Sequence, residues 1–217
     1  MPKSPLYMKI ANEALRNSSL WLAEANNLLF EKKSFGHSCA LSIYSIEETV
    51  KAFECFMVGL GVADEKAESV KEVFKNHHAK METVEILALS LSSPLLSKAI
   101  ISELDQNELK ELGDGLKMIE PYFENEIHKL VKTREKGIYV DVVEDRITSP
   151  NDFSIEEAER FFFIAFNLKR LVQFMVKIYE ESDNEERQKK IKNAQTFSNQ
   201  LRENIKKLKL KLDNNKT

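Results

Sequence analysis

Apolar residues recur every three to four positions over long, unbroken stretches of this chain, which is the pattern of amphipathic helices. Only six glycines and five prolines occur in 217 residues, so few positions suit the turns of a many-stranded barrel or sandwich. With 42% hydrophobic residues, the chain can also bury a substantial core. We therefore predict an all-α fold, and the length indicates about one domain or slightly more.

The sequence indicates where the long helices begin and end. A first helix is predicted over residues 4–31 and a second from residue 37 to about residue 60. A third helix is predicted over residues 154–181. Its start is marked by Ser154 and Glu157, which have the spacing of a capping box.

The second predicted helix divides into an apolar and a polar face. Glu47 and Lys51 lie four residues apart on the polar face, in the favourable order for an intrahelical ion pair. If these two side chains are exposed, they form an ordinary surface ion pair and indicate no function. If another element covers the face, the buried charges need partners, and Arg134 is the obvious cation for Glu47 or Glu48. The apolar stripe consists of Cys39, Ile43, Ile46, Val50, Phe53, Met57 and Leu60.

Shorter helices and one long insertion are predicted between the second and third long helices. The helices are expected over residues 65–91, 103–112 and 116–133. From about residue 134 to residue 153 we predict a long structured loop with room for a short strand, because residues 137–143 are rich in β-branched and aromatic side chains. Long insertions of this kind in compact helical domains are often functional.

The end of the chain differs in charge from the rest. Residues 185–217 contain ten basic and four acidic residues, although the whole chain has a formal net charge of −3. Apolar residues in this segment follow a heptad alternation, which fits a short coiled coil or a docked amphipathic helix. A solvated helix is favoured over a nucleic-acid-binding arm. We expect a helical domain over residues 1–182 and a basic amphipathic C-terminal helix or tail over 183–217.

Signatures of several common protein classes are missing from the sequence. Cys39 and Cys55 lack the spacing of zinc ligands or of a disulfide framework, so we expect reduced core residues, no metal and no cofactor. The longest apolar run, Phe161–Phe166, is too short to span a membrane, and no signal-peptide pattern follows the first residues. We therefore expect a soluble cytoplasmic protein. Glycine-rich phosphate loops, serine-hydrolase elbows and zinc-protease pairs are also missing.

The most distinctive string is Arg134–Asp141, which places a guanidinium suited to phosphate near a phenol and a carboxylate. Together with Ser149-Pro150 and Ser154–Ala158, it resembles the AbiV family of abortive-infection proteins, a branch of the HEPN superfamily. Two earlier segments agree with this resemblance. Residues 37–52 look like that family's small-residue helix ending in a Glu-Glu-x-Gly-Lys-like motif, and residues 77–80 match its His-x-x-Lys element.

The resemblance implies a HEPN-like helical bundle and a role in shutting down a phage-infected cell. Many HEPN proteins are metal-independent endoribonucleases whose Arg-x(4 to 6)-His motifs meet across a dimer interface. In that chemistry a base activates the ribose 2′-OH, an arginine stabilises the phosphorane, and an acid protonates the leaving 5′ oxygen. Here Tyr139 stands five residues after Arg134 in place of histidine, and Val50 replaces the glycine expected before Lys51. A phenol with its ordinary pKa of about 10 is a poor base at neutral pH.

The resemblance and the polar residues on the predicted helices give a set of candidate site residues, and each also has a structural interpretation. Arg134 could cap a helix and pair with a neighbouring carboxylate. Tyr139 and Asp141 could pin the loop, and His77 could be an ordinary surface histidine. The candidate catalytic residues are Arg134, Tyr139, Asp141, Glu47 and His77, and the candidate RNA-binding residues are Lys51, Lys80, Arg134 and Lys136.

The sequence thus predicts an abortive-infection effector of the AbiV/HEPN type, with metal-independent RNA cleavage or another block of translation as its candidate activity. The alternative is a non-catalytic HEPN module that binds a partner protein or RNA and acts by sequestration. A weaker third possibility is a helical domain that senses a nucleotide or small molecule. We expect a two-fold homodimer, RNA as a partner, and a phage-encoded or host protein as the trigger, with no membrane partner.

Overall fold

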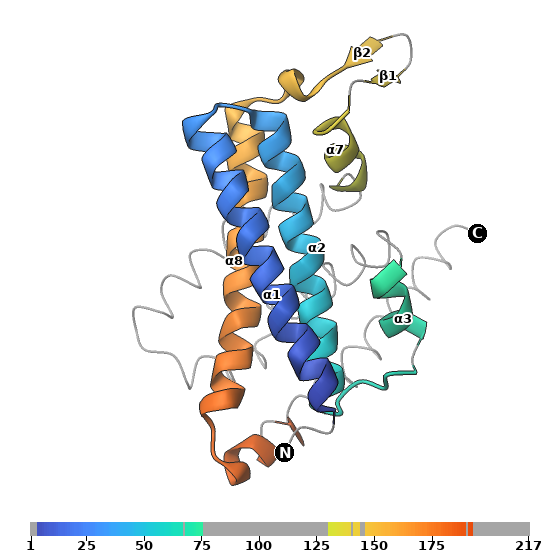
Figure 1. The fold of residues 1–217 in the computed structure, drawn as a ribbon, viewed down its shortest axis with the longest axis vertical. Helices are drawn as coiled ribbons and strands as arrows, with labels where there is room; N and C mark the ends of the chain where they lie inside the picture. Colours follow the sequence, from blue (N-terminus) through green and yellow to red (C-terminus); the bar gives the residue numbers. More distant parts are fainter. Residues whose placement is uncertain are drawn as a thin grey trace, which may run out of the picture.

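Long helices dominate the computed structural model, which describes residues 4–66, 68–75, 130–139, 141–143, 146–189 and 191–192. Helices α1 (Pro5–Asn26), α2 (Phe35–Gly59) and α8 (Ile155–Glu181) lie side by side along the long axis (Figure 1). A π-helical turn over Asn27–Glu31 extends α1. The three predicted long helices are confirmed, and the all-α fold with them.

The start of α8 is fixed by local hydrogen bonds. The Ser154 hydroxyl accepts a hydrogen bond from the Glu157 amide at 3.2 Å, and the Glu157 carboxylate accepts one from the Ser154 amide at 2.9 Å. This is the predicted capping box, and it satisfies backbone donors that would otherwise be unpaired at a helix start. Backbone hydrogen bonding also lowers the pKa of Glu156 in the same turn. The loop before α8 therefore enters the helix in a defined direction.

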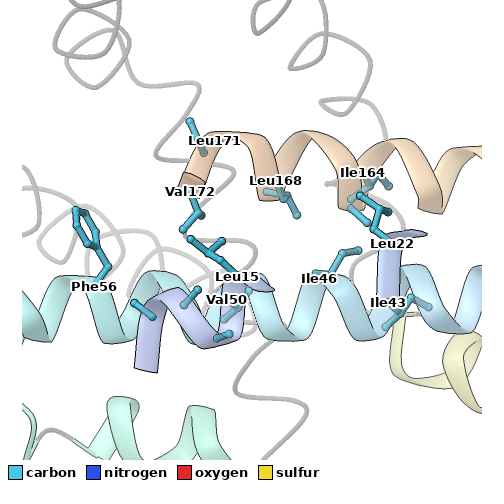
Figure 2. Close-up of a cluster of buried hydrophobic side chains, with 14 of the residues drawn as sticks. Leu15, Leu22, Ile43, Ile46, Val50, Phe56, Ile164, Leu168, Leu171 and Val172 are labelled. Atoms are coloured by element: carbon cyan, nitrogen blue, oxygen red, sulfur yellow. The ribbon is translucent and has the colours of Figure 1, made fainter. Parts of the chain in front are cut away.

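The hydrophobic core lies where α1, α2 and α8 meet (Figure 2). Cys39 and Cys55 are free thiols buried within it, as predicted, and burial raises the pKa of each to about 12. Phe53 differs from the rest of the predicted stripe because it is only half-buried. The core side chains labelled in Figure 2 are Leu15, Leu22, Ile43, Ile46, Val50, Phe56, Ile164, Leu168, Leu171 and Val172.

Hydroxyl side chains line the contact between α1 and α2. The Ser18 hydroxyl lies 2.8 Å from both the Ser45 and the Thr49 hydroxyl, and Ser38 donates to the Ala25 carbonyl at 2.8 Å. Small side chains let two helices approach closely, and these hydrogen bonds satisfy polar groups that would be costly to bury alone. The Ser42 hydroxyl is buried in the same helix and has no hydrogen-bond partner among the described residues.

Shorter elements occupy the ends and one side of this bundle. The predicted loop over about 134–153 begins later than expected, because helix α7 continues through the first three of those residues. The described residues beyond α7 include two antiparallel strands, in which Asp141 lies opposite Thr148, and a 3₁₀ turn. The elements are α3 (Glu68–Lys75), α7 (Leu130–Lys136), β1 (Asp141–Val143), β2 (Arg146–Thr148) and the 3₁₀ turn Pro150–Asp152.

Part of the predicted organisation lies outside the described residues. This holds for the helices expected over 103–112 and for most of those over 65–91 and 116–133, and for the basic tail beyond residue 192. Just after α8, Arg187 donates to the carbonyls of Tyr179 and Glu180 at 2.9 and 2.6 Å. The described segment after residue 182 is therefore tied to the end of α8, and the division of the chain at that point stays a prediction.

A bilayer-crossing helix must be both long and strongly apolar. Within the described ranges, no helix meets both conditions.

Candidate functional site

Helix α7 packs against α2 through two glycines. A Cβ atom on Gly137, just beyond α7, would lie 2.4 Å from the Gly36 carbonyl oxygen and 3.1 Å from the Ala40 side chain. A Cβ atom on Gly36 would lie 2.3 Å from the Pro150 carbonyl oxygen. The start of α2, the end of α7 and the 3₁₀ turn after the hairpin therefore meet in a contact that only glycine permits. Figure 1 shows this meeting point at one end of the bundle.

A buried ion pair joins the same two helices. The Arg134 guanidinium donates to the Glu47 carboxylate at 2.6 Å, and the two side chains are only 9% and 3% exposed. Because burying either charge alone would be strongly unfavourable, each holds the other in place. Arg134 is also 3.9 Å from the exposed Glu135 carboxylate. The sequence-based expectation that a covered Glu47 would pair with Arg134 is confirmed as a contact.

An aromatic side chain lies beside this ion pair. The guanidinium of Arg134 is 5.4 Å from the centre of the Tyr44 ring, within the range of a cation–π interaction. Tyr44 in turn packs against Trp21 of α1, with the ring centres 5.6 Å apart. Side chains from α7, α2 and α1 thus form one continuous row. Trp21 is 40% exposed, so the row reaches the surface.

Glu47 and Lys51, whose spacing favours an intrahelical ion pair, have different partners in the structure. Lys51 pairs with Glu48, which also accepts a hydrogen bond from Asn17 at 3.4 Å. The reason is that α7 covers the predicted polar face of α2. Glu47 points into that contact and takes the buried cation, whereas Lys51 remains half-buried and pairs along its own helix.

Tyr139 is exposed, whereas the sequence analysis allowed for a phenol that pins the loop. It is 64% exposed, so a buried phenol that pins the loop is excluded, and the aromatic partner of Arg134 is Tyr44 instead. The Tyr139 amide donates to the Glu135 carbonyl at 3.0 Å, which places the residue directly after α7. Lys136 is exposed in the last turn of α7. Asp141 begins β1, five residues after the last residue of α7.

Two predicted site residues, His77 and Lys80, lie outside the described residues. Tyr44 was missed as a partner of Arg134, although it falls on the same predicted polar face as Glu47, one turn earlier. His37 was also missed as a neighbour of the site. It is an exposed imidazole next to Gly36, and its Nδ1 atom is 2.9 Å from the Ser34 hydroxyl.

The described part of the chain contains no cluster of three or more His, Cys, Asp or Glu side chains suited to a metal ion. It brings together a guanidinium, a carboxylate and an aromatic row within the bundle. An exposed ammonium lies in the last turn of α7 and an exposed phenol just beyond it. Such groups can stack on bases and donate hydrogen bonds to phosphate oxygens.

The family model for the HEPN domain of AbiV proteins matches residues 6–170. That stretch contains the Arg134–Glu47 pair, the glycine contact and the hairpin. This chain belongs to the AbiV family. It is therefore an abortive-infection protein of the HEPN superfamily, and its helical bundle is the fold of that superfamily. Comparisons with curated proteins and with solved structures found no match.

Proposed function

We propose that this AbiV-family protein defends against phage by acting on RNA at the end of the bundle where α7 meets α2. Metal-independent cleavage of the RNA backbone is the candidate reaction. The observation that supports this proposal is the buried Arg134–Glu47 pair, because it fixes the helix from which Lys136 and Tyr139 reach solvent. Tyr139 follows directly after this helix, because its amide donates to the Glu135 carbonyl at 3.0 Å.

Buried and exposed residues have different roles in this proposal. Arg134 holds α7 against α2, since its guanidinium contacts both the Glu47 carboxylate and the Tyr44 ring. Lys136 is exposed and attracts the phosphate backbone. The Tyr139 phenol stacks on a base or, in the cleavage reaction, donates its proton to the leaving 5′ oxygen. For cleavage, the 2′-OH proton must pass to a base, and the exposed His37 imidazole lies at the same end of α2.

A second candidate function is non-catalytic RNA or protein binding that acts by sequestration. The observation that favours it is the 9% exposure of the Arg134 side chain. In the cleavage chemistry of this superfamily, an arginine stabilises the negative charge of the phosphorane. A guanidinium with so little exposed surface presents few donors to that group.

Both candidates are tested by incubating the full chain with RNA in EDTA and analysing the ends. Cleavage predicts 2′,3′-cyclic phosphate ends, and their loss in Tyr139→Phe and Lys136→Ala. Lys9→Ala is the matched control, because Lys9 is an exposed lysine of α1 near the opposite end of the bundle. Arg134→Ala is unsuitable as a first test, since it would leave Glu47 buried without its cation.

The same samples distinguish the two candidates from each other. Fluorescence anisotropy with labelled RNA should detect binding in either case, with a salt dependence that weakens in Lys136→Ala because one phosphate contact is lost. Binding without cyclic phosphate ends would favour sequestration. The proposal is wrong if the wild-type chain neither binds RNA nor changes its ends, and if adding it leaves in vitro translation unaffected.

A further inference from the structure

The only tryptophan in the sequence, Trp21, lies at the surface of α1. It is 40% exposed, although Ser18, Leu22 and Ala25 around it on the same helix are buried. A single exposed apolar side chain is ordinary by itself. Trp21 differs from such a residue because other side chains hold its ring from beneath.

Trp21 is the outer end of a row of stacked groups. Its ring centre is 5.6 Å from that of Tyr44, with 32° between the two planes, and the Tyr44 ring lies 5.4 Å from the Arg134 guanidinium. The inner end of the row is fixed, because Arg134 is paired with the buried Glu47. Tyr44 therefore covers one side of the indole, and the remaining ring surface faces solvent. A ligand that lands there meets a side chain already ordered, which lowers the entropy cost of binding.

Polar side chains border the exposed indole. On α1, Asn17 lies four residues before Trp21 and Glu24 three residues after it, and both are exposed. The Asn17 amide also donates to Glu48 of α2 at 3.4 Å. The other exposed apolar side chain nearby, Leu20, projects about 100° around the helix from Trp21, so the two do not form one broad apolar groove. These surroundings fit a flat ligand with apolar faces and polar edges, which is the chemistry of a nucleobase.

The row also lies close to the site proposed for RNA. His37 is seven residues before Tyr44, so it lies on the same side of α2, two turns or about 11 Å nearer the start of that helix. The glycine contact lies beside His37 and brings Lys136 of α7 to the same end. A strand with one base on Trp21 would therefore reach the exposed imidazole and ammonium by running along α2.

We propose that Trp21, backed by Tyr44, is a stacking platform for one unpaired base of RNA bound at the α7 end of the bundle. The proposal rests on the proposed function and gives it a substrate class. A base within a continuous duplex is already stacked between its neighbours and cannot reach the indole, whereas bases in single strands, loops and bulges can. Stacking accepts every base, so little sequence preference is expected at this position.

The first experiment uses the fluorescence of Trp21, which reports on this position without a label or a substitution because no other tryptophan is present. Titrating the full chain with a single-stranded RNA oligonucleotide should quench the emission, with the same midpoint as the anisotropy of the labelled oligonucleotide. The same oligonucleotide annealed to its complement should quench little. Mononucleotides at equal nucleotide concentration should also quench little, because they lack the continuous phosphate backbone.

The second experiment compares variants by anisotropy with the single-stranded oligonucleotide. Trp21→Ala should weaken binding by about fivefold or more, and Trp21→Phe, which keeps a ring, should recover most of the loss. Leu20→Ala is the matched control: Leu20 is an apolar residue of the same helix, 58% exposed, and its loss should leave binding unchanged. Trp21→Ala should also keep the salt dependence of binding, whereas Lys136→Ala should weaken it, because only Lys136 is proposed to contact a phosphate.

Failure of this inference can be distinguished from failure of the proposed function. A chain that binds the oligonucleotide without a change in Trp21 emission would overturn the stacking platform and leave the action on RNA standing. Equal losses in Leu20→Ala and Trp21→Ala would also overturn it, because the outer surface of α1 would then act as a general apolar surface. Quenching by mononucleotides as strong as by the oligonucleotide would assign a nucleotide site in place of an RNA platform. A chain that binds no RNA would remove the proposed function and this inference together.

Discussion

Helix α2 is held by its neighbours in two different ways. Toward α8 it presents apolar side chains such as Ile46 and Val50, which are fully buried and pack in the common core. Toward α7 it presents Glu47 and the backbone of Gly36, which meet a buried guanidinium and another glycine. Apolar packing distributes its stabilisation over many weak contacts, whereas the α7 side depends on a few contacts that each need one specific residue.

The difference predicts that single substitutions on the α7 side are disproportionately harmful. It also bears on function, because the exposed residues proposed to meet RNA are positioned from that side. Releasing α7 would require breaking one buried ion pair and a small glycine contact, whereas separating α8 would require opening the core. The predictions below compare the two sides of α2.

The largest expected effect is that of Glu47→Ala. Removing the carboxylate leaves Arg134 buried without its counter-charge, which should lower the free energy of unfolding by about 3–5 kcal/mol. Urea unfolding followed by circular dichroism measures this change. Glu13→Ala is the control, because its side chain is 59% exposed, and it should change stability by less than about 0.5 kcal/mol.

The double variant Glu47→Leu/Arg134→Met tests the cause of that loss. If the uncompensated charge is responsible, replacing both partners by apolar side chains should recover much of the stability lost in the single variant, because buried pairs can be exchanged for apolar groups at little net cost. A double variant as unstable as Glu47→Ala would show that the ion pair is not what holds α7 against α2.

The second prediction concerns the glycine contact. Gly137→Ala places a methyl group 2.4 Å from a backbone carbonyl that cannot move easily, so we expect a loss of about 1–3 kcal/mol from overpacking. Gly59→Ala is the matched control in α2, because there the close neighbour is the flexible Met8 side chain, 2.6 Å away. Thermal unfolding should show a clearly smaller shift for Gly59→Ala. Equal shifts would mean that the contact of α7 with α2 is not tightly constrained.

The two sides of α2 also differ in how well the sequence predicts them. The long helices follow from local signals: apolar periodicity, a capping box and the absence of glycine and proline within α8. The Arg134–Glu47 contact was expected because a buried acid needs a cation, and Arg134 was the distinctive candidate. Tyr44 as the second partner, and the exposure of Tyr139, depend on which face of α2 the short helix α7 covers. No local pattern encodes that choice.

The third prediction measures how much a substitution on the side of α2 facing α8 lowers the free energy of unfolding. Ile46→Val removes one methylene from the centre of the core, and such a change costs about 0.5–1.5 kcal/mol. The effect should be well below that of Glu47→Ala, although the two residues are adjacent in the sequence. Urea unfolding of both variants under identical conditions gives the comparison. A larger loss in Ile46→Val would reverse the proposed contrast between the two sides.

The smallest expected change in stability is that of Tyr139→Phe. Because Tyr139 is 64% exposed, losing its hydroxyl should alter the free energy of unfolding by less than about 0.5 kcal/mol. Any loss of RNA cleavage or phage protection in this variant would then come from the missing phenol group and not from unfolding. Tyr44→Phe is the control in the row beside Arg134, since it keeps the ring that faces the guanidinium. A marked drop in the melting temperature of Tyr139→Phe would instead give the phenol a structural role, and the exposed end of the bundle would lose its clearest candidate for contact with RNA.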